Sequence, residues 1–244
     1  AIRINEISFR YDPHSLKKTL DNITFEIPEG KVTAIVGASG SGKTTLIKLM
    51  LGYYPVSEGA IMVSGKNINE YNLKWWRRCC GVVMQDGVIF SESIARNIAV
   101  GDSEVDIARL EQAARIACIH DYILSLPLKY NTKIGRDGVG LSQGQKQRIL
   151  IARAVYKNPV FIFLDEATNS LDAKNEREIV ENLDDFYKGR TVVVVAHRLS
   201  TVKNADQIVV IDSGKVVEKG THTELIEKQG GYFNLVKNQL ELGN

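Results

Sequence analysis

Residues Gly37 to Thr44 read Gly-Ala-Ser-Gly-Ser-Gly-Lys-Thr, which is the G-x-x-x-x-G-K-[ST] pattern of a phosphate-binding loop. The glycines allow backbone angles that other residues resist, so consecutive N–H groups can turn toward phosphate oxygens. Lys43 can supply a positive charge to the β- and γ-phosphates, and the Thr44 hydroxyl can bind Mg²⁺. We therefore expect a nucleoside triphosphate to be held by Gly37, Ala38, Ser39, Gly40, Ser41, Gly42, Lys43, Thr44 and Thr45.

The residues on either side of this loop predict a strand and a helix. Lys31 to Val36 is a short apolar run that ends at Gly37, which is typical of a buried parallel strand. Thr45 to Leu51 has a helical pattern that ends at Gly52. A loop that opens a helix also gains the helix dipole and the unpaired N–H groups of the first turn, so these elements favour an anion site over a chance glycine-rich turn.

Two later apolar runs, Val160 to Leu164 and Thr191 to Ala196, predict further buried strands. A helical pattern between them, which ends at Gly189, indicates a right-handed strand–helix–strand unit with parallel strands. The first run is followed by Asp165-Glu166 and the second by His197. Because such sheets bind ligands at the carboxyl ends of their strands, we expect these residues to converge on the phosphate-binding loop.

The types of these residues suit phosphate chemistry. Asp165 would orient the shell of a Mg²⁺ ion, usually through water, and Glu166 would act as general base on the water that attacks the γ-phosphate. His197 could link the γ-phosphate to the region of Glu166. Two solvated acids at a strand end and a structural histidine are the alternatives; a lone histidine is more often structural.

The bulk composition limits the class of protein. The chain has 244 residues, 44% of them hydrophobic, enough for one large domain. Its formal charge of +2 is too balanced to indicate nucleic acid or a membrane surface as the main partner. The three cysteines lack metal-ligand spacing and suggest reduced thiols. No apolar stretch approaches the roughly 20 residues of a membrane span. Because the chain begins at Ala1 rather than Met, we expect a domain of a larger protein.

The remaining patterns predict an α/β fold. Ile2 to Tyr11 alternates with a phase slip near Asn5-Glu6, which indicates a bulge in a first, antiparallel sheet that also takes a strand over Gly59 to Lys66. Gln207 to Asp212 begins a late hairpin around Ser213-Gly214. We expect one domain: an antiparallel β-subdomain with the phosphate loop over 1–70, a mostly helical lobe over 71–157, and the rest of the α/β core over 158–244.

A fourth motif, Leu141-Ser142-Gln143-Gly144-Gln145, identifies a family. With the phosphate loop and Asp165-Glu166, it resembles the ATP-binding-cassette (ABC) ATPases, which have a P-loop NTPase core with a mostly parallel sheet and a helical signature lobe. The family signature is Leu-Ser-Gly-Gly-Gln, so Gln143 departs at the third position. The resemblance implies that this segment meets the γ-phosphate of ATP held by a second subunit. Ser142 and Gln145 also form an S-x-x-Q capping box.

The resemblance covers nearly the whole chain and implies further roles. Tyr11 would stack on adenine, and Gln85 would touch Mg²⁺ and the attacking water. Asp172 would lie in a segment between two ATP sites, although it could equally be only a helix N-cap. The cofactors implied are ATP and Mg²⁺. The implied catalytic set is Lys43, Gln85, Glu166 and His197; the implied metal set is Thr44, Gln85 and Asp165.

ABC ATPases work as head-to-tail pairs, in which each ATP lies between the phosphate loop of one subunit and the signature of the other. ATP holds the pair together and hydrolysis releases it. Since both halves of the site look intact here, the resemblance predicts a homodimer with two competent sites.

Within the family, Phe90 to Ile98 and the His197 to Val202 segment look like exporter sequences. Gly135-Arg136-Asp137-Gly138 departs from the exporter pattern Gly-Glu-Arg-Gly. The Ser-Gln-Gly-Gln variant and the sequence as a whole are similar to those of bacterial exporters of peptides or bacteriocins, some of which carry a peptidase domain. This implies transmembrane domains in the same polypeptide that contact the loop around Gln85–Asn97, at the cytoplasmic face of the bacterial inner membrane.

Two alternatives remain open at this point. A soluble ABC ATPase acting on ribosomes or DNA would predict a second cassette, a long charged insertion and often a basic surface. An importer subunit would more often begin with its own Met and carry a regulatory tail. The sequence does not state the transported substrate.

Overall fold

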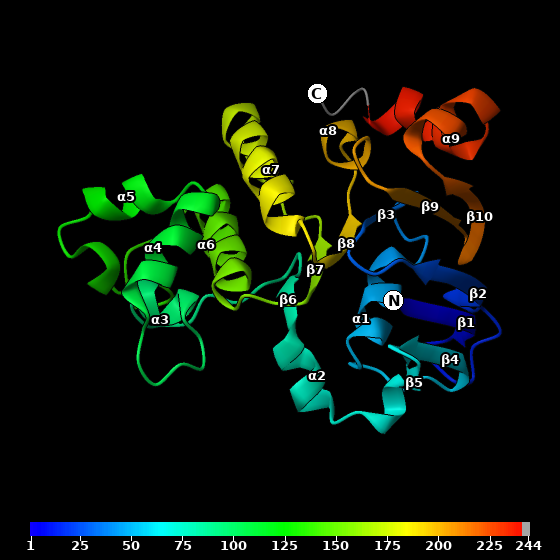
Figure 1. Cartoon of the computed structure of the whole chain (residues 1–244), viewed down its shortest axis with the longest axis horizontal. Helices are drawn as coiled ribbons and strands as arrows, with labels where there is room; N and C mark the ends of the chain where they lie inside the picture. Colours follow the sequence, from blue (N-terminus) through cyan, green and yellow to red (C-terminus); the bar gives the residue numbers. More distant parts are fainter. Residues whose placement is uncertain (241–244) are drawn as a thin grey trace.

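Two β-sheets and a group of helices make up the computed structural model, which describes residues 1–240 (Figure 1). The antiparallel sheet has the order β2-β1-β4-β5. Its strands are β1 (Ile2–Phe9), β2 (Leu20–Ile27), β4 (Glu58–Val63) and β5 (Lys66–Asn67). The predicted bulge in β1 is present, because the register with β2 shifts between Ile4 and Ile7 and Glu6 has a φ of 50°.

One strand prediction in this sheet is wrong. Gly59 to Lys66 is not a single strand, because the chain turns at Ser64-Gly65 and β5 pairs back onto β4. Ser64 and Gly65 both have positive φ, at 48° and 83°, which suits a tight hairpin turn.

The second sheet has the order β10-β9-β3-β8-β7-β6 and is mostly parallel, as predicted. Only the hairpin of β9 and β10 is antiparallel. The strands are β3 (Val32–Val36), β6 (Cys80–Val83), β7 (Phe161–Asp165), β8 (Thr191–Val195), β9 (Gln207–Asp212) and β10 (Lys215–Gly220). Strand β6 is not predicted from the sequence, where residues 71–157 are expected to be mostly helical.

Helix α1 (Lys43–Met50) packs between the two sheets. Leu46 and Met50 lie in one core cluster with Ile4 of the antiparallel sheet and Ile35 of β3. Neighbouring Ala34, by contrast, faces a second cluster, shared with the helices on the other side of the parallel sheet. Burial on both faces explains the nearly continuous apolar sequence of β3.

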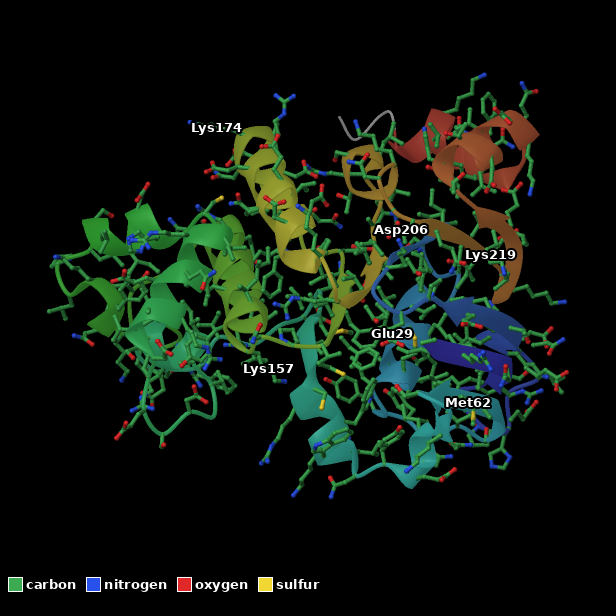
Figure 2. The ribbon with its side chains drawn as sticks, in the orientation of Figure 1. Glu29, Met62, Lys157, Lys174, Asp206 and Lys219 are labelled. Atoms are coloured by element: carbon green, nitrogen blue, oxygen red, sulfur yellow. The ribbon has the colours of Figure 1, made fainter. Side chains whose placement is uncertain are left out.

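A group of helices stands to one side of the sheets (Figure 1). It contains α3 (Ile94–Ile98), α4 (Ile107–Ile116), α5 (His120–Ser125) and α6 (Gln143–Tyr156). α2 (Leu73–Cys79) leads into β6. Lys157, labelled in Figure 2, ties the end of α6 to this segment, because its ammonium donates to the carbonyls of Arg77 at 2.6 Å and Cys80 at 2.7 Å.

The rest of the chain adds α7 (Ala173–Tyr187) and α8 (Leu199–Val202) beside β7 and β8 (Figure 1). It then adds α9 (His222–Lys228), α10 (Gly231–Leu235) and a π-helical turn (Val236–Leu240). Short 3₁₀ turns lie at Ile68–Glu70 and Lys129–Asn131. Within residues 1–240, no helix has both the length and the apolar character needed to cross a bilayer.

Candidate active site

Four neighbouring strands of the parallel sheet, β3, β8, β7 and β6, end at the same edge. β3 runs into the phosphate-binding loop, β7 ends in Asp165, and β8 is followed by His197. β6 is followed by Gln85, which is exposed. The predicted convergence of three strand ends is confirmed, and the unpredicted strand β6 brings a fourth chemical group to the same edge.

The phosphate-binding loop folds around the Lys43 ammonium. Nζ donates to the carbonyls of Gly37 and Ala38, both at 2.8 Å, and the side chain is buried. Burial lowers the pKa of Lys43, and the charges of Glu166 and Asp165 oppose that shift. Within residues 1–240 this buried cation has carbonyl partners but no direct anionic partner, so the loop is suited to an incoming phosphate.

Glycine is needed at the last position of the loop before the lysine. Gly42 is the N-cap of α1 with a φ of 108°, and a Cβ there would lie 2.6 Å from Leu20 Cδ2 and 3.0 Å from Thr19 O. The helix begins at Lys43, two residues before the predicted start, so its first turn is itself part of the loop. Backbone N–H groups at that end remain available for an anion.

Thr44 and Asp165 form the part of the site that suits a metal ion. Thr44 Oγ1 donates to Asp165 Oδ2 at 2.8 Å, while Asp165 Oδ1 is buried without a hydrogen-bond partner in the described part of the chain. Burial raises the pKa of Asp165, and the bond from Thr44 partly offsets it. An orphaned carboxylate oxygen beside a hydroxyl fits Mg²⁺, which prefers oxygen ligands.

Within residues 1–240, no cluster of three or more His, Cys, Asp and Glu side chains could hold a metal alone. A Mg²⁺ ion here would therefore take its other ligands from phosphate oxygens and water, as it commonly does in nucleotide sites. Thr44 and Asp165 fit this donor set. Gln85 lies at the same sheet edge, where its amide oxygen is a further possible ligand.

Glu166 lies in an uncommon backbone conformation and its carboxylate is held at both oxygens. Its φ is 52°, and its N–H donates to Val195 O at 2.9 Å. Oε1 lies 2.5 Å from His197 Nε2, and Oε2 accepts from Asn169 Nδ2 at 2.7 Å. This geometry brings the predicted base and histidine together. Asn169 was missed by the sequence analysis, and its only local signal is its position three residues after Glu166.

Tyr11 presents a half-exposed ring beside the phosphate loop. Its hydroxyl lies 2.7 Å from Thr45 Oγ1, and it is 51% exposed. Phe9 and Tyr54 meet the ring edge-on, with centroid distances of 5.1 and 5.3 Å. The ring is thus held from several sides while much of it stays open, which suits stacking on a planar base. Tyr54 was not predicted from the sequence.

The signature segment caps α6 as predicted. Ser142 Oγ accepts from the N–H of Gln145 at 3.1 Å, and the Gln145 side chain accepts from the N–H of Ser142 at 2.9 Å. Gln143 is exposed in the first turn. A Cβ at Gly144 would lie 3.2 Å from Ser170 O, so α6 packs closely on the segment after Glu166.

Asp172 caps α7 by accepting from the N–H of Asn175 at 3.0 Å, and this bond lowers the pKa of Asp172. Asp172 therefore has the structural role of helix N-cap that the sequence analysis gave as the alternative. Neither Asp172 nor the Ser142–Gln145 segment is hydrogen-bonded to the phosphate loop within the described part of the chain.

Residues 20–169 match the family described as "ABC transporter". The chain belongs to the ABC transporter family. Its phosphate loop, Asp165-Glu166 pair and two-sheet core make it an ATP-binding, ATP-hydrolysing domain of that family. The family resemblance of the sequence motifs and the predicted α/β fold are thereby confirmed.

Similar proteins and a similar solved structure support this family assignment. The chain is 44% identical over 241 residues to the "Leukotoxin translocation ATP-binding protein LktB" of Mannheimia haemolytica and to the protein of the same name in Bibersteinia trehalosi. The match covers 99% of this chain and 34% of each relative, so the chain spans about a third of their length. The "Structure of a bacterial Atm1-family ABC exporter with ATP bound" matches 97% of this chain and 41% of that one, with 37% identity and a TM-score of 0.91.

Proposed function

We propose that this ABC domain hydrolyses Mg-ATP between two head-to-tail subunits and thereby drives export of a substrate through membrane-spanning domains. The observation that carries the hydrolytic part is the Glu166 carboxylate, held by His197 and Asn169 at the sheet edge where the phosphate loop and Asp165 also lie. The export part is supported by relatives whose names describe translocation and export.

In this proposal Glu166 is the general base. Its carboxylate accepts the proton of the attacking water, while His197, at 2.5 Å, keeps that carboxylate in one orientation and contacts the γ-phosphate. Lys43 exchanges its bonds to Gly37 and Ala38 for bonds to phosphate oxygens, which are stronger acceptors for an ammonium. The geometry supplies positioning and electrostatic stabilisation, which dominate phosphoryl transfer.

Thr44, Asp165 and Gln85 would hold Mg²⁺ together with the ATP phosphates. The ion would neutralise charge on the β- and γ-phosphate oxygens. Asp165 supports this role because one of its oxygens is buried and has no hydrogen-bond partner among the residues that the structure describes. Tyr11 would stack on the adenine ring from its place beside Thr45.

The second half of each ATP site would come from another copy of the chain. Ser142 and its neighbours Gln143, Gly144 and Gln145 present a capped helix terminus, and such a terminus attracts anions. Asp172 would lie between the two sites. Since one chain carries a complete phosphate loop and a complete signature segment, we propose a homodimer with two ATP molecules.

A cationic groove supports a partner at the membrane. The lobe groove runs between α2 and β6 on one side and α3, α4 and α6 on the other; it is lined by Arg78, Val82, Ile98, Val100, Asp102, Arg109, Arg153, Ala154, Tyr156 and Lys157. We propose that membrane-spanning domains of the same polypeptide dock there and on the loop Gln85–Asn97. The site of action would be the cytoplasmic face of a bacterial inner membrane. The substrate class would be a peptide, because the sequence resembles those of bacterial peptide exporters.

In this proposal the chain is one functional domain with three sections. Residues 1–70 would bind the adenine ring and the phosphates. Residues 71–157 would carry the signature segment and the contact with the membrane-spanning domains, and 158–244 would supply the catalytic residues at the strand ends. The names of the relatives favour this exporter over the soluble and importer alternatives.

The mass of Glu166→Gln with and without Mg-ATP tests the proposal. This variant should bind ATP and hydrolyse it at least about a hundredfold more slowly than wild type, since a positioned general base contributes roughly 10²–10⁴-fold. Trapped ATP should then double its molar mass in light scattering. Glu227→Gln, the same change on the exposed face of α9, is the matched control and should keep wild-type turnover.

Two results would count against the proposal. Wild-type turnover in Glu166→Gln would remove Glu166 from the role of base. A monomer that binds ATP at saturation would show that the isolated domain does not form the two-site pair.

A further inference from the structure

Gln147 is a buried glutamine on α6 that touches the catalytic segment at two points. It lies five residues after Ser142, is 7% exposed, and points into the body of the molecule. Its Nε2 donates to Glu166 O at 3.2 Å, and its Oε1 accepts from the N–H of Ser170 at 3.1 Å. One side-chain amide therefore bridges both ends of the turn Glu166–Ser170.

This turn needs support from outside. Glu166 is a non-glycine residue at a φ of 52°, a conformation that is unfavourable for residues with a Cβ and persists only where the surroundings hold it. The N–H of Glu166 is bonded to Val195 O, and its carbonyl accepts from Gln147. The carbonyl also takes a longer bond of 3.3 Å from the N–H of Asn169. Gln147 is the group from outside the turn that fixes this carbonyl.

The direction of the Glu166 carboxylate depends on this backbone. A rotation of the Glu166 peptide would swing the side chain away from His197 and Asn169, which hold its two oxygens. A displacement of about 1 Å can cost on the order of a hundredfold in rate. Gln147 therefore acts on the reacting carboxylate through the backbone, without touching it.

The same amide connects this turn to the signature helix. Gly144 packs on the Ser170 carbonyl so closely that a Cβ would lie at 3.2 Å, and Gln147 lies one turn further along α6. The N-terminus of α6 is the part that the proposed dimer places on the ATP of the other subunit. A shift of α6 toward that ATP would therefore move Gln147 with the helix, and the hydrogen bonds of the Gln147 amide would displace the backbone of Glu166 and Ser170.

We propose that Gln147 is a positioning residue that couples the signature helix to the catalytic glutamate of the same subunit. It makes Glu166 hydrolytically competent when α6 is engaged at the neighbouring ATP site. This inference rests on the proposed function, because it needs Glu166 as base and α6 as the trans contact. A buried amide that only fills space would give the same burial but no specific effect on turnover.

The test uses two variants of Gln147. Gln147→Met keeps the length of the side chain and removes both hydrogen bonds; Gln147→Glu keeps an acceptor for Ser170 and loses the donor to Glu166. Both should lower kcat about tenfold or more and leave KM for ATP within about twofold, because the bonds position the base and do not bind nucleotide. Val155→Ala, a buried change farther along α6, is the control and should keep kcat within about twofold.

Melting temperature and ATP affinity check that each variant is folded. If Gln147→Met does not fold, Gln147→Glu carries the test, because it retains a polar partner for Ser170. A wild-type kcat in either folded variant overturns the proposal, as does a loss of ATP affinity equal to the loss of turnover.

A double-mutant cycle separates positioning from general destabilisation. In a Glu166→Gln background there is no base to position, so adding Gln147→Met should change the residual rate by less than about twofold. Effects that multiply would mean that Gln147 acts independently of Glu166, and the coupling proposal would fail. If Glu166→Gln alone keeps the wild-type rate, the proposed function itself fails, and the two failures are thereby distinguished.

Discussion

At the scale of single residues, the site contains a carboxylate that the described protein groups satisfy only at one oxygen. Asp165 is fully buried, one of its oxygens has no hydrogen-bond partner among residues 1–240, and burial raises its pKa. Burying an ionised group without complete compensation costs stability. The site is therefore preorganised for a cation at a cost to the stability of the fold, a common arrangement at functional sites.

Replacing Asp165 by Asn should stabilise the nucleotide-free protein at neutral pH. Because the folded pKa lies above the ordinary value of 3.8, the stability linked to this carboxyl is fully present below that value. It is lost as pH rises through the folded pKa. Asparagine removes the charge, so Asp165→Asn should melt above wild type at about pH 7, by about 2–4 °C for each kcal/mol gained, and the gap should close toward about pH 4.

Melting curves across this pH range check the sign. Asp172→Asn is the matched control, because the pKa of Asp172 is lowered by its bond from Asn175 and its linkage has the opposite sign. Mg-ATP should raise the melting temperature of wild type much more than that of Asp165→Asn. A variant that melts below wild type at neutral pH would show that Asp165 is compensated in the empty site.

At the scale of elements, the start of α6 combines a structural cap with the proposed trans contact. Ser142→Ala should remove the cap, with a cost of about 0.5–2 kcal/mol, and lower turnover. Ser142→Asp should keep the stability, because aspartate caps equally well, yet abolish ATP-driven pairing by placing a negative charge at the γ-phosphate. Thermal melting and light scattering with Mg-ATP measure the two effects. Normal pairing in Ser142→Asp would contradict the trans role.

Several elements could be predicted from the sequence because their signals are local. The phosphate loop, the caps at Ser142 and Asp172, and the bulge near Glu6 each depend on a few adjacent residues whose backbone requirements are strict. The strands that lead to Asp165 and His197 are buried on both faces, so each reads as an unbroken apolar run.

Other features depend on partners distant in the chain. β6 has only four residues, Cys80–Val83, and forms because it pairs with β7, some 80 residues later. Asn169 and Gln147 occur in no motif used in the sequence analysis, and their contacts with Glu166 exist only after α6 packs on the segment behind β7. Residue type and spacing were therefore enough to predict the candidate reacting groups. The groups that position them could be found only from the contacts in the folded structure.

At the scale of the whole molecule, the lobe groove lies between the helical group and the segment of α2 and β6. Its cations are of two kinds. Arg153 and Lys157 are bonded to backbone carbonyls and hold the walls together. Arg78 is exposed, so its charge is open to a partner. If membrane-spanning domains dock here, Arg78 can contribute to docking without supporting the fold.

Arg78→Glu should therefore separate ATP hydrolysis from transport. In the isolated domain, kcat and KM should stay within about twofold of wild type, because Arg78 lies outside the catalytic site. In the longer protein, reconstituted in lipid vesicles, transport and its stimulation of hydrolysis should fall about tenfold, since reversing a charge at a complementary interface costs on the order of 1–3 kcal/mol. Lys219→Glu makes the same change on β10, away from the groove (Figure 2), and should leave transport unaltered. Equal transport by both variants would place the membrane contact elsewhere on the domain.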